Sequence, residues 1–179
     1  IVKLLIIDYV RSFNMVSTFR LRRSIIAAML LALTLVLGRF FLIPIPWTHG
    51  NVNLCDAGVF IAAMLLGPGA GTIVGGFGGM FLDLISGFPQ DALFSFAAHG
   101  LEGFISGWIY KKYGNTTWGK WTAILAGTIV MIAIYFICNT VMYHVITGFL
   151  SLGSNFIQGM IGGIVALIVI RQLKKHHVG

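Results

Sequence analysis

One otherwise apolar segment of the sequence carries polar and ionisable side chains at helical spacing: Asp91, Ser95, His99, Glu102 and Ser106. Residues three or four apart lie on one face of an α-helix, so these five side chains would form a polar stripe. An imidazole and a carboxyl group at this spacing can bind a polar ligand, or they can act together as an acid and a base. Ionisable groups inside a membrane cost about 2.5–3.5 kcal/mol each on insertion scales, which makes them candidates for function.

Polar groups in other segments fall at positions from which they could meet this stripe. Asn51 and Asn53 lie in a polar loop, and Asp83 ends the apolar segment that precedes the stripe. Later segments add the remaining polar groups: Tyr135, Asn139, Tyr143, His144, Ser151, Asn155 and Gln158. We expect these groups to converge in a pocket for a small polar or aromatic molecule, because hydrogen-bonding groups fix orientation and rings supply stacking area.

Most of these residues also have a structural interpretation without a ligand. Asp56 and Asp91 stand where helix N-caps belong, and the two asparagines of the loop suit ordinary turns. His99 and Glu102 could satisfy each other as a purely structural pair, and the tyrosines could pack in the bundle or lie in an interfacial belt. Asn139 is harder to explain in this way, because a lone amide in hydrocarbon needs a partner.

The composition indicates what kind of elements must position these groups. Of 179 residues, 58% are hydrophobic and 9% are charged, and the mean hydropathy is +0.93. A soluble domain of this size could not bury so much apolar surface. The apolar runs are long and lack the alternation of a barrel, so the chain is predicted to be an all-α integral membrane protein. Six transmembrane helices are expected, near residues 24–43, 54–66, 69–86, 91–110, 121–147 and 151–171.

The positive charges predict the orientation of these spans. With both termini cytoplasmic, all of the 12 Lys and Arg except Arg39 face the cytoplasm, as the positive-inside rule requires. The polar pocket would then open on the outer face of the cell membrane, which the chain crosses several times. The net charge of +7 is therefore juxtamembrane and favours contact with the lipid bilayer and its anionic headgroups over nucleic acid.

The chain divides into a cytoplasmic or interfacial segment over residues 1–22, a six-helix substrate-binding domain over 23–175 and a tail over 176–179. Residues 1–14 do not begin with Met and are too short to span a membrane, so a misassigned start, with Met15 as the first residue, is the alternative interpretation. An interfacial amphipathic helix would also suit this segment.

The sequence predicts no catalytic residue, no metal site and no cofactor. Cys55 and Cys138 are too few and too poorly spaced for a metal site. The glycine-rich run over residues 75–79 lacks the following Lys-Ser or Lys-Thr of a phosphate-binding loop. Uphill transport would therefore need a partner or an ion gradient as its energy source.

Several short motifs occur in a defined order along the chain: Asn53-Leu54-Cys55-Asp56-Ala57-Gly58, Leu66-Gly67-Pro68-Gly69-Ala70-Gly71, Gly75-Gly76-Phe77-Gly78, Asp83-Leu84, Gly87-Phe88-Pro89-Gln90 and His99-Gly100-Leu101-Glu102-Gly103. With these motifs the sequence resembles the S components, the substrate-binding subunits, of energy-coupling factor (ECF) vitamin transporters. The resemblance covers about residues 23–175 and is closest to the riboflavin-type and the hydroxymethylpyrimidine- or pyridoxine-type branch.

The resemblance implies an S component of an ABC importer that captures a vitamin from outside, with the first loop as a lid. Partners would be a transmembrane T component, docked on Ala28 and Ala32, and two ATPase subunits. Pyridoxine or hydroxymethylpyrimidine is favoured as the ligand, and riboflavin or pantothenate is the alternative. The residues expected to bind it are Asn51, Asn53, Asp83, Gln90, His99, Glu102, Asn139, Tyr143 and Asn155.

Two functions from other classes remain open at this point. A membrane-embedded enzyme could use His99 and Glu102 as acid and base, although the sequence has neither a metal-binding histidine pair nor a nucleophile elbow. A proton-coupled carrier could relay protons through Glu102, although the two halves of the sequence show no convincing internal repeat.

Overall fold

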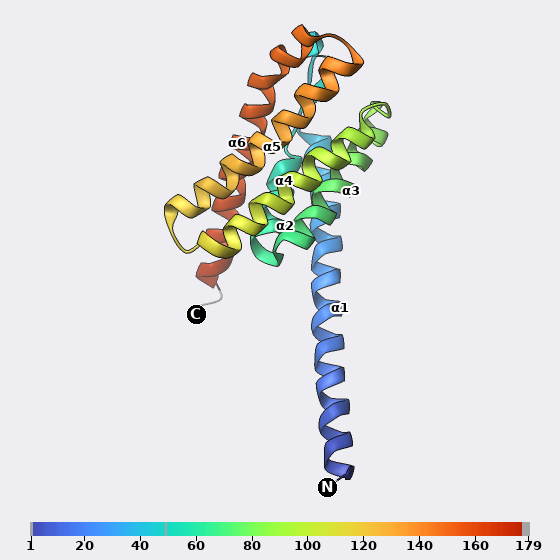
Figure 1. Ribbon diagram of the computed structural model, residues 1–179, viewed down its shortest axis with the longest axis vertical. Coiled ribbons are helices and arrows are strands. Elements are labelled where there is room, and N and C mark those ends of the chain that lie inside the picture. The colour runs from blue at the N-terminus through green and yellow to red at the C-terminus, as the bar shows by residue number, and fades with distance from the viewer. Residues whose placement is uncertain (1, 49, 177–179) are drawn as a thin grey trace.

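The computed structural model describes residues 2–48 and 50–176, which fold into a bundle of six α-helices with one short hairpin (Figure 1). The helices are α1 (Val2–Phe40), α2 (Cys55–Leu66), α3 (Pro68–Ser86), α4 (Ala92–Tyr113), α5 (Thr117–Met142) and α6 (Val145–His176). Both ends of the described chain lie away from the hairpin, and α1 extends well beyond the other helices.

Within the described residues, four helical segments are long and apolar enough to cross a membrane: Arg20–Phe40, Pro68–Ser86, Thr117–Met142 and Val145–Leu173. Helix α2 has only 12 residues, and α4 combines the buried Glu102 with Lys111 and Lys112 in its last turn. The structure therefore has the predicted number and order of helices, whereas six spans and cytoplasmic termini stay predictions.

The first loop is more ordered than the all-α prediction allows. Strands β1 (Ile43–Ile45) and β2 (Gly50–Val52) pair antiparallel and flank a 3₁₀ turn, η1 (Pro46–Thr48). Pro44 lies opposite Asn51 in this two-stranded ribbon, where an edge position tolerates its missing N–H. The ribbon fixes the position of Asn51 at the mouth of the bundle.

The break between the last two helices lies earlier than the sequence predicts. Helix α5 ends at Met142 and α6 begins at Val145, whereas the predicted spans end at 147 and begin again at 151. Gly148, which falls between the two predicted spans, is buried inside α6. A Cβ atom there would lie 2.5 Å from Thr140 Oγ1 and 3.0 Å from the carbonyl oxygen of Phe136. Gly148 therefore permits a close helix crossing and does not end a helix.

Helix α1 is continuous through the boundary that the sequence predicts near residue 22. Its 39 residues include Arg20, Arg22 and Arg23 without interruption. Ala28 and Ala32, the predicted docking pair, are both exposed on this helix. The division at residue 22 stays a prediction, because a continuous helix can still cross from an interfacial segment into a membrane.

Glycines bring α3 and α4 into backbone contact. A Cβ atom on Gly75 would lie 2.1 Å from the carbonyl oxygen of His99, and one on Gly71 would lie 2.6 Å from that of Gly103. Only glycine fits at such distances, because no real Cβ atom approaches a backbone oxygen so closely. This close approach positions His99 at the centre of the bundle, beside helix α2, which is buried from Cys55 to Met64.

Candidate functional site

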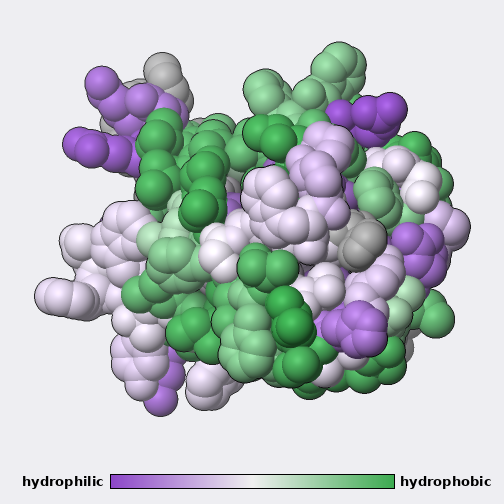
Figure 2. Space-filling view, turned by 90° about the horizontal axis from the view of Figure 1, so that it is seen from above, coloured by the Kyte–Doolittle hydropathy of each residue, from purple (hydrophilic) through white to green (hydrophobic). Residues whose placement is uncertain are grey.

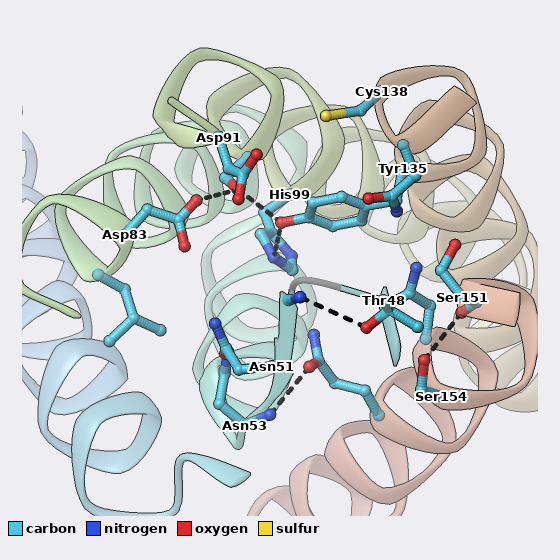
Figure 3. Close-up of a pocket in the computed structure, with 17 residues that line it drawn as sticks. Thr48, Asn51, Asn53, Asp83, Asp91, His99, Tyr135, Cys138, Ser151 and Ser154 are labelled. Carbon is cyan, nitrogen blue, oxygen red and sulfur yellow. Dashed lines mark hydrogen bonds between the residues drawn. The ribbon is translucent and has the colours of Figure 1, made fainter. Parts of the chain in front are cut away.

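A polar pocket opens at the hairpin end of the bundle (Figure 3). Seen from this end, pale and purple polar residues interrupt the green apolar surface (Figure 2). The hairpin and helices α3 to α6 all supply lining residues. The polar ones are Thr48, Asn51, Asn53, Asp83, Asp91, Ser95, His99, Tyr135, Asn139, Ser151, Ser154, Asn155 and Gln158. The cavity volume is about 50 Å³, several times the ~10–15 Å³ that one water molecule needs.

A buried ionisable cluster forms the base of this pocket. His99 Nδ1 lies 3.1 Å from Asp56 Oδ1 on α2 and 2.9 Å from Glu102 Oε2 one turn along α4. Both carboxyl groups have no exposed surface, and His99 is 2% exposed. Nδ1 is within hydrogen-bonding distance of both carboxyl groups, and when it carries the proton it can donate to either of them.

The other ring nitrogen of His99 begins a hydrogen-bonded chain that returns to the pocket wall. Tyr135 OH lies 3.2 Å from His99 Nε2 and 2.6 Å from Ser95 Oγ. Ser95 in turn donates to the Asp83 carboxylate. The chain therefore connects the buried cluster with Asp83, a carboxylate that lines the cavity.

A second chain connects the hairpin with the same cluster. The backbone N–H of Asn53 donates to Gln158 Oε1 at 2.9 Å, and Gln158 Nε2 donates to Asp56 Oδ1 at 3.3 Å. The Asn53 side chain donates to Asn51 Oδ1 at 2.8 Å and accepts from the backbone N–H of Cys55 at 2.9 Å. Asn53 therefore fixes both the hairpin and the start of α2.

These contacts correct the capping interpretations. Asp56 does not cap α2, because it lies inside the first turn, fully buried, and pairs with His99. Asp91 occupies the N-cap position of α4 but makes no side-chain cap bond. Partial burial raises the pKa of the Asp91 carboxyl above its usual range, because the charged form is less well solvated there.

Six of the nine predicted ligand-binding residues line the pocket: Asn51, Asn53, Asp83, His99, Asn139 and Asn155. Three are not among its lining residues. Gln90 is exposed in the α3–α4 turn, Glu102 lies behind His99, and Tyr143 is the C-cap of α5. Contact of any of these nine residues with a ligand stays a prediction.

Sequence reasoning missed several lining residues. Thr48 and Ser154 line the pocket, but threonine and serine are also common in ordinary turns and helices, so the sequence did not single them out. Cys138, considered in the sequence only as a metal ligand, lies one residue before Asn139 on the same wall. Ser154 lies between Ser151 and Asn155 on the polar face of α6 that the sequence analysis already indicated, so helical spacing could have added it.

The buried cluster includes a possible ligand set for a metal ion that the sequence did not suggest. Ligand atoms of Cys55, Asp56 and His99 all lie within 4.8 Å of one another. Cys55 Sγ, however, lies 3.7 Å from His99 Nε2, whereas Asp56 faces Nδ1. One ion cannot bind both ring nitrogens of a single imidazole, so the arrangement fits a hydrogen-bonded cluster better than a metal centre.

Comparisons with known proteins agree with this geometry. Residues 18–175 match the family model of the ECF-type riboflavin transporter, S component. The thiamine precursor transporter HmpT of Lactococcus lactis subsp. cremoris is 34% identical over 150 residues, which cover 83% of this chain and 86% of that protein.

Two solved structures share the fold. An S component of a bacterial ECF transporter matches with a TM-score of 0.72 at 26% identity and covers 88% of this chain and 98% of that chain. The S component for biotin from an ECF-type ABC transporter matches with a TM-score of 0.71 at 21% identity, covering 88% and 93% of the two chains. The second likeness concerns the fold alone.

Proposed function

This chain belongs to the ECF-type riboflavin transporter S component family, and on that premise we propose that it captures hydroxymethylpyrimidine, a thiamine precursor, from outside the cell. The family consists of transporter subunits and not of enzymes. The observation that carries the proposal is the convergence of polar side chains from the hairpin and four helices on one cavity.

The proposed arrangement has six spans with both termini in the cytoplasm of a bacterial cell. Short α2 and charged α4 would complete the set of spans inside the bundle, where neighbouring helices shield them from lipid. In support, Lys111 and Lys112 lie in the last turn of α4 and Arg171 lies near the end of α6, toward the end opposite the hairpin, whereas Arg39 of α1 lies near the hairpin. The pocket would then face outward, and the hairpin would act as its lid.

The pocket chemistry suits a small aminated heterocycle. Asp83 offers a carboxylate acceptor, and Asn139 and Asn155 offer amides that can both donate and accept. Tyr135, which contacts His99 and Ser95, adds an aromatic ring. Amino and ring nitrogens of a pyrimidine would match this mixture of donors and acceptors, as the name of the Lactococcus relative also suggests.

Two other vitamins fit less well. The family description names riboflavin, a fused three-ring ligand that would need a longer cavity than a single pyrimidine ring does. Pantothenate is an anion and would need a cation, and the described residues that line the pocket include no Lys or Arg. Related proteins share a scaffold while their pocket residues vary, so the family alone does not name the ligand.

Each polar residue has a proposed role. Asn51, Asn53, Asp83, Asn139 and Asn155 would contact the ligand. His99 would present the base of the pocket, held by Glu102 and Asp56. Neither Gln90 nor Tyr143 lines the cavity in this conformation, so their contact would require movement of the adjacent turns.

Energy for uptake would come from partner subunits. We propose that a transmembrane T component docks on Ala28 and Ala32 of α1, which are exposed and one turn apart. Small residues at this spacing let another helix approach closely. Two ATPase subunits would complete the importer in the plasma membrane.

A proton-coupled carrier is the second candidate, since His99 joins two buried carboxyl groups. The two functions differ in what they require. Uptake by the proposed S component needs co-expressed T and ATPase subunits, whereas a carrier would work alone and stop when the proton gradient is dissipated.

Thermal unfolding of the detergent-purified chain tests the ligand. A ligand at 100 times its dissociation constant stabilises the folded state by about 2.7 kcal/mol. The panel would contain hydroxymethylpyrimidine, pyridoxine, riboflavin and pantothenate at equal concentrations. Stabilisation by hydroxymethylpyrimidine above all others is the expected result, and stabilisation by riboflavin alone would refute the ligand assignment.

A further inference from the structure

A second cavity lies at the end of the bundle opposite the hairpin and is far larger than the first. Its volume is about 680 Å³. It is bounded by α1, by the turn between α2 and α3, and by the last turn of α4 with the loop that follows. None of the polar-pocket residues contributes to it.

The shortness of α2 explains why this cavity exists. Its 12 residues rise only about 18 Å, whereas the hydrocarbon core of a bilayer is ~30 Å thick. The α2–α3 turn, Gly67–Pro68, is therefore recessed between α1 and α4, which continue past it. Backbone at this depth needs protein or polar groups around it, because hydrocarbon cannot satisfy its N–H and C=O groups, and a lipid headgroup in the hollow would supply polar groups.

The cavity combines a cationic rim with an apolar wall. Arg22 and Arg23 lie in the first turn of the apolar segment that begins at Arg20, and Lys111 lies in the last turn of α4. Ile26, Leu65 and Leu66 supply apolar surface beside them. No Asp or Glu is among the described residues that line the cavity.

One of these cations is already held over the hollow. The Arg23 guanidinium donates to the carbonyl oxygen of Leu66 at the end of α2. This bond bridges α1 and the recessed turn, and it keeps positive charge at the rim. Arg22 and Lys111 are both exposed, so two further cations can turn toward an anion in the cavity.

We propose that this cavity binds one anionic phospholipid. The phosphate lies at Arg22, Arg23 and Lys111, and the part of an acyl chain nearest the headgroup lies along the apolar wall. Basic pockets between membrane helices at the cytoplasmic boundary are suited to such headgroups. The site is distinct from the general attraction of a basic surface for lipid, because it has walls on three sides.

The geometry of α1 favours lipid over a partner helix as the occupant. At 100° per residue, Arg22, Arg23 and Ile26 lie on one side of α1, and Ala28 and Ala32 lie on roughly the opposite side. A T component docked on the two alanines would leave the cavity open to the bilayer. The proposal does not depend on which vitamin the polar pocket binds.

Native mass spectrometry and thermal unfolding of the full chain test the proposal. The protein would be titrated with phosphatidylglycerol or with phosphatidylcholine of identical acyl chains, and separately with inorganic phosphate. We expect one retained phosphatidylglycerol with a preference of about tenfold or more over phosphatidylcholine, since each nearby cation contributes about 1 kcal/mol. Stabilisation by inorganic phosphate equal to that by phosphatidylglycerol would overturn the assignment to a lipid.

Two charge-matched double variants locate the site. R22Q/K111Q removes two rim cations and leaves the Arg23 bond to α2 intact, whereas R171Q/K175Q removes two exposed cations of α6 outside the cavity. Loss of the preference in R22Q/K111Q alone supports the site. An equal loss in both variants would reduce the effect to general surface charge and overturn the proposal.

A third outcome would assign the cavity to protein. If R22Q/K111Q retains the phosphatidylglycerol preference but no longer assembles with the T component in phosphatidylcholine vesicles, the cavity is a docking surface and the lipid proposal fails. Circular dichroism and size-exclusion chromatography of both variants establish that they are folded.

Discussion

The two ends of this bundle use polar residues in opposite ways. At the hairpin end, the ionisable groups are buried and bonded to one another, as in the contacts of His99 with Asp56, Glu102 and Tyr135. At the other end, Arg22 and Lys111 are exposed around a cavity more than ten times larger. The first arrangement is preorganised for one small ligand, whereas the second adapts to a flexible amphipathic one.

The difference follows from where each group can find partners. Inside the bundle an unpaired charge is costly, so carboxyl and imidazole groups persist there only as a network. At the membrane boundary, water and headgroups solvate long cationic side chains, so no network is needed. Substitutions should therefore act cooperatively at the hairpin end and locally at the other.

The largest expected effect comes from the glycine contact that positions His99. In Gly75→Ala, the new Cβ atom would overlap the His99 carbonyl oxygen, which lies 2.1 Å away. We expect a loss of about 3 kcal/mol in the free energy of unfolding and loss of ligand binding. Gly69→Ala is the control in the same helix, because no atom lies within 4 Å of its added Cβ. Equal stability of the two variants would contradict the proposed packing.

Bulk on the exposed face of α1 should separate binding from transport. Ala28→Trp or Ala32→Trp is expected to reduce uptake to background in cells that express the T and ATPase subunits, because a partner helix can no longer approach. Ligand affinity of the purified chain should stay unchanged. Ile129→Trp, at an exposed position of α5, is the matched control and should keep full uptake. Full uptake in the α1 variants would contradict the assignment of Ala28 and Ala32 as the docking site.

Neutralising the pocket carboxylate should weaken the ligand directly. Asp83→Asn removes one charged acceptor, and hydrogen bonds to charged groups contribute about 1.5–3 kcal/mol, so affinity should fall by about 10- to 100-fold. Gln90→Ala, in the exposed turn outside the pocket, should bind as the native chain does. A larger loss of ligand affinity in Gln90→Ala than in Asp83→Asn would assign the ligand contact to Gln90 and contradict its assignment to Asp83.

A smaller change is expected within the chain from His99 to Asp83. Tyr135→Phe removes the hydroxyl between His99 Nε2 and Ser95 Oγ but keeps the ring. One neutral hydrogen bond contributes about 0.5–1.5 kcal/mol, which corresponds to a loss of affinity of about 3- to 10-fold. Calorimetric titration of the variant measures it, and unchanged affinity would exclude Tyr135 from organising the pocket.

The smallest effect concerns Asp91 at the mouth. Its raised pKa means that the folded chain favours the protonated carboxyl over the charged one. The stability that the protonated form contributes is therefore present at low pH and is lost as pH rises through the raised pKa. Asp91→Asn should therefore stabilise the ligand-free protein at neutral pH by less than about 1 kcal/mol after solvent screening. The difference should vanish at a pH below the usual range for aspartate, and thermal unfolding at two pH values measures it.

Much of this arrangement could be predicted from local sequence. The stripe from Asp91 to Ser106 fell on one helix face because helical periodicity alone determines it. The predicted pairing of His99 with Glu102 is present at 2.9 Å. The glycine spacing of α3 also indicated a packing surface, since small residues at this interval permit close helix approach.

Contacts between distant segments could not be predicted. Asp56 resembled an N-cap because its sequence position precedes an apolar run, yet its carboxylate pairs with a histidine 43 positions later. The bond from Asn53 to Gln158 joins residues 105 positions apart. The predicted start of α6 at residue 151 was too late, because the close crossing at Gly148 depends on contacts with α5 that local sequence does not show.

Titration calorimetry of hydroxymethylpyrimidine into the purified chain, with riboflavin as a competitor, tests the central claim most directly. The account predicts saturable one-to-one binding that riboflavin does not displace and that Asp83→Asn weakens. Absence of heat from hydroxymethylpyrimidine in a folded sample, or binding that Asp83→Asn leaves unchanged, would contradict the assignment of the hairpin-end pocket.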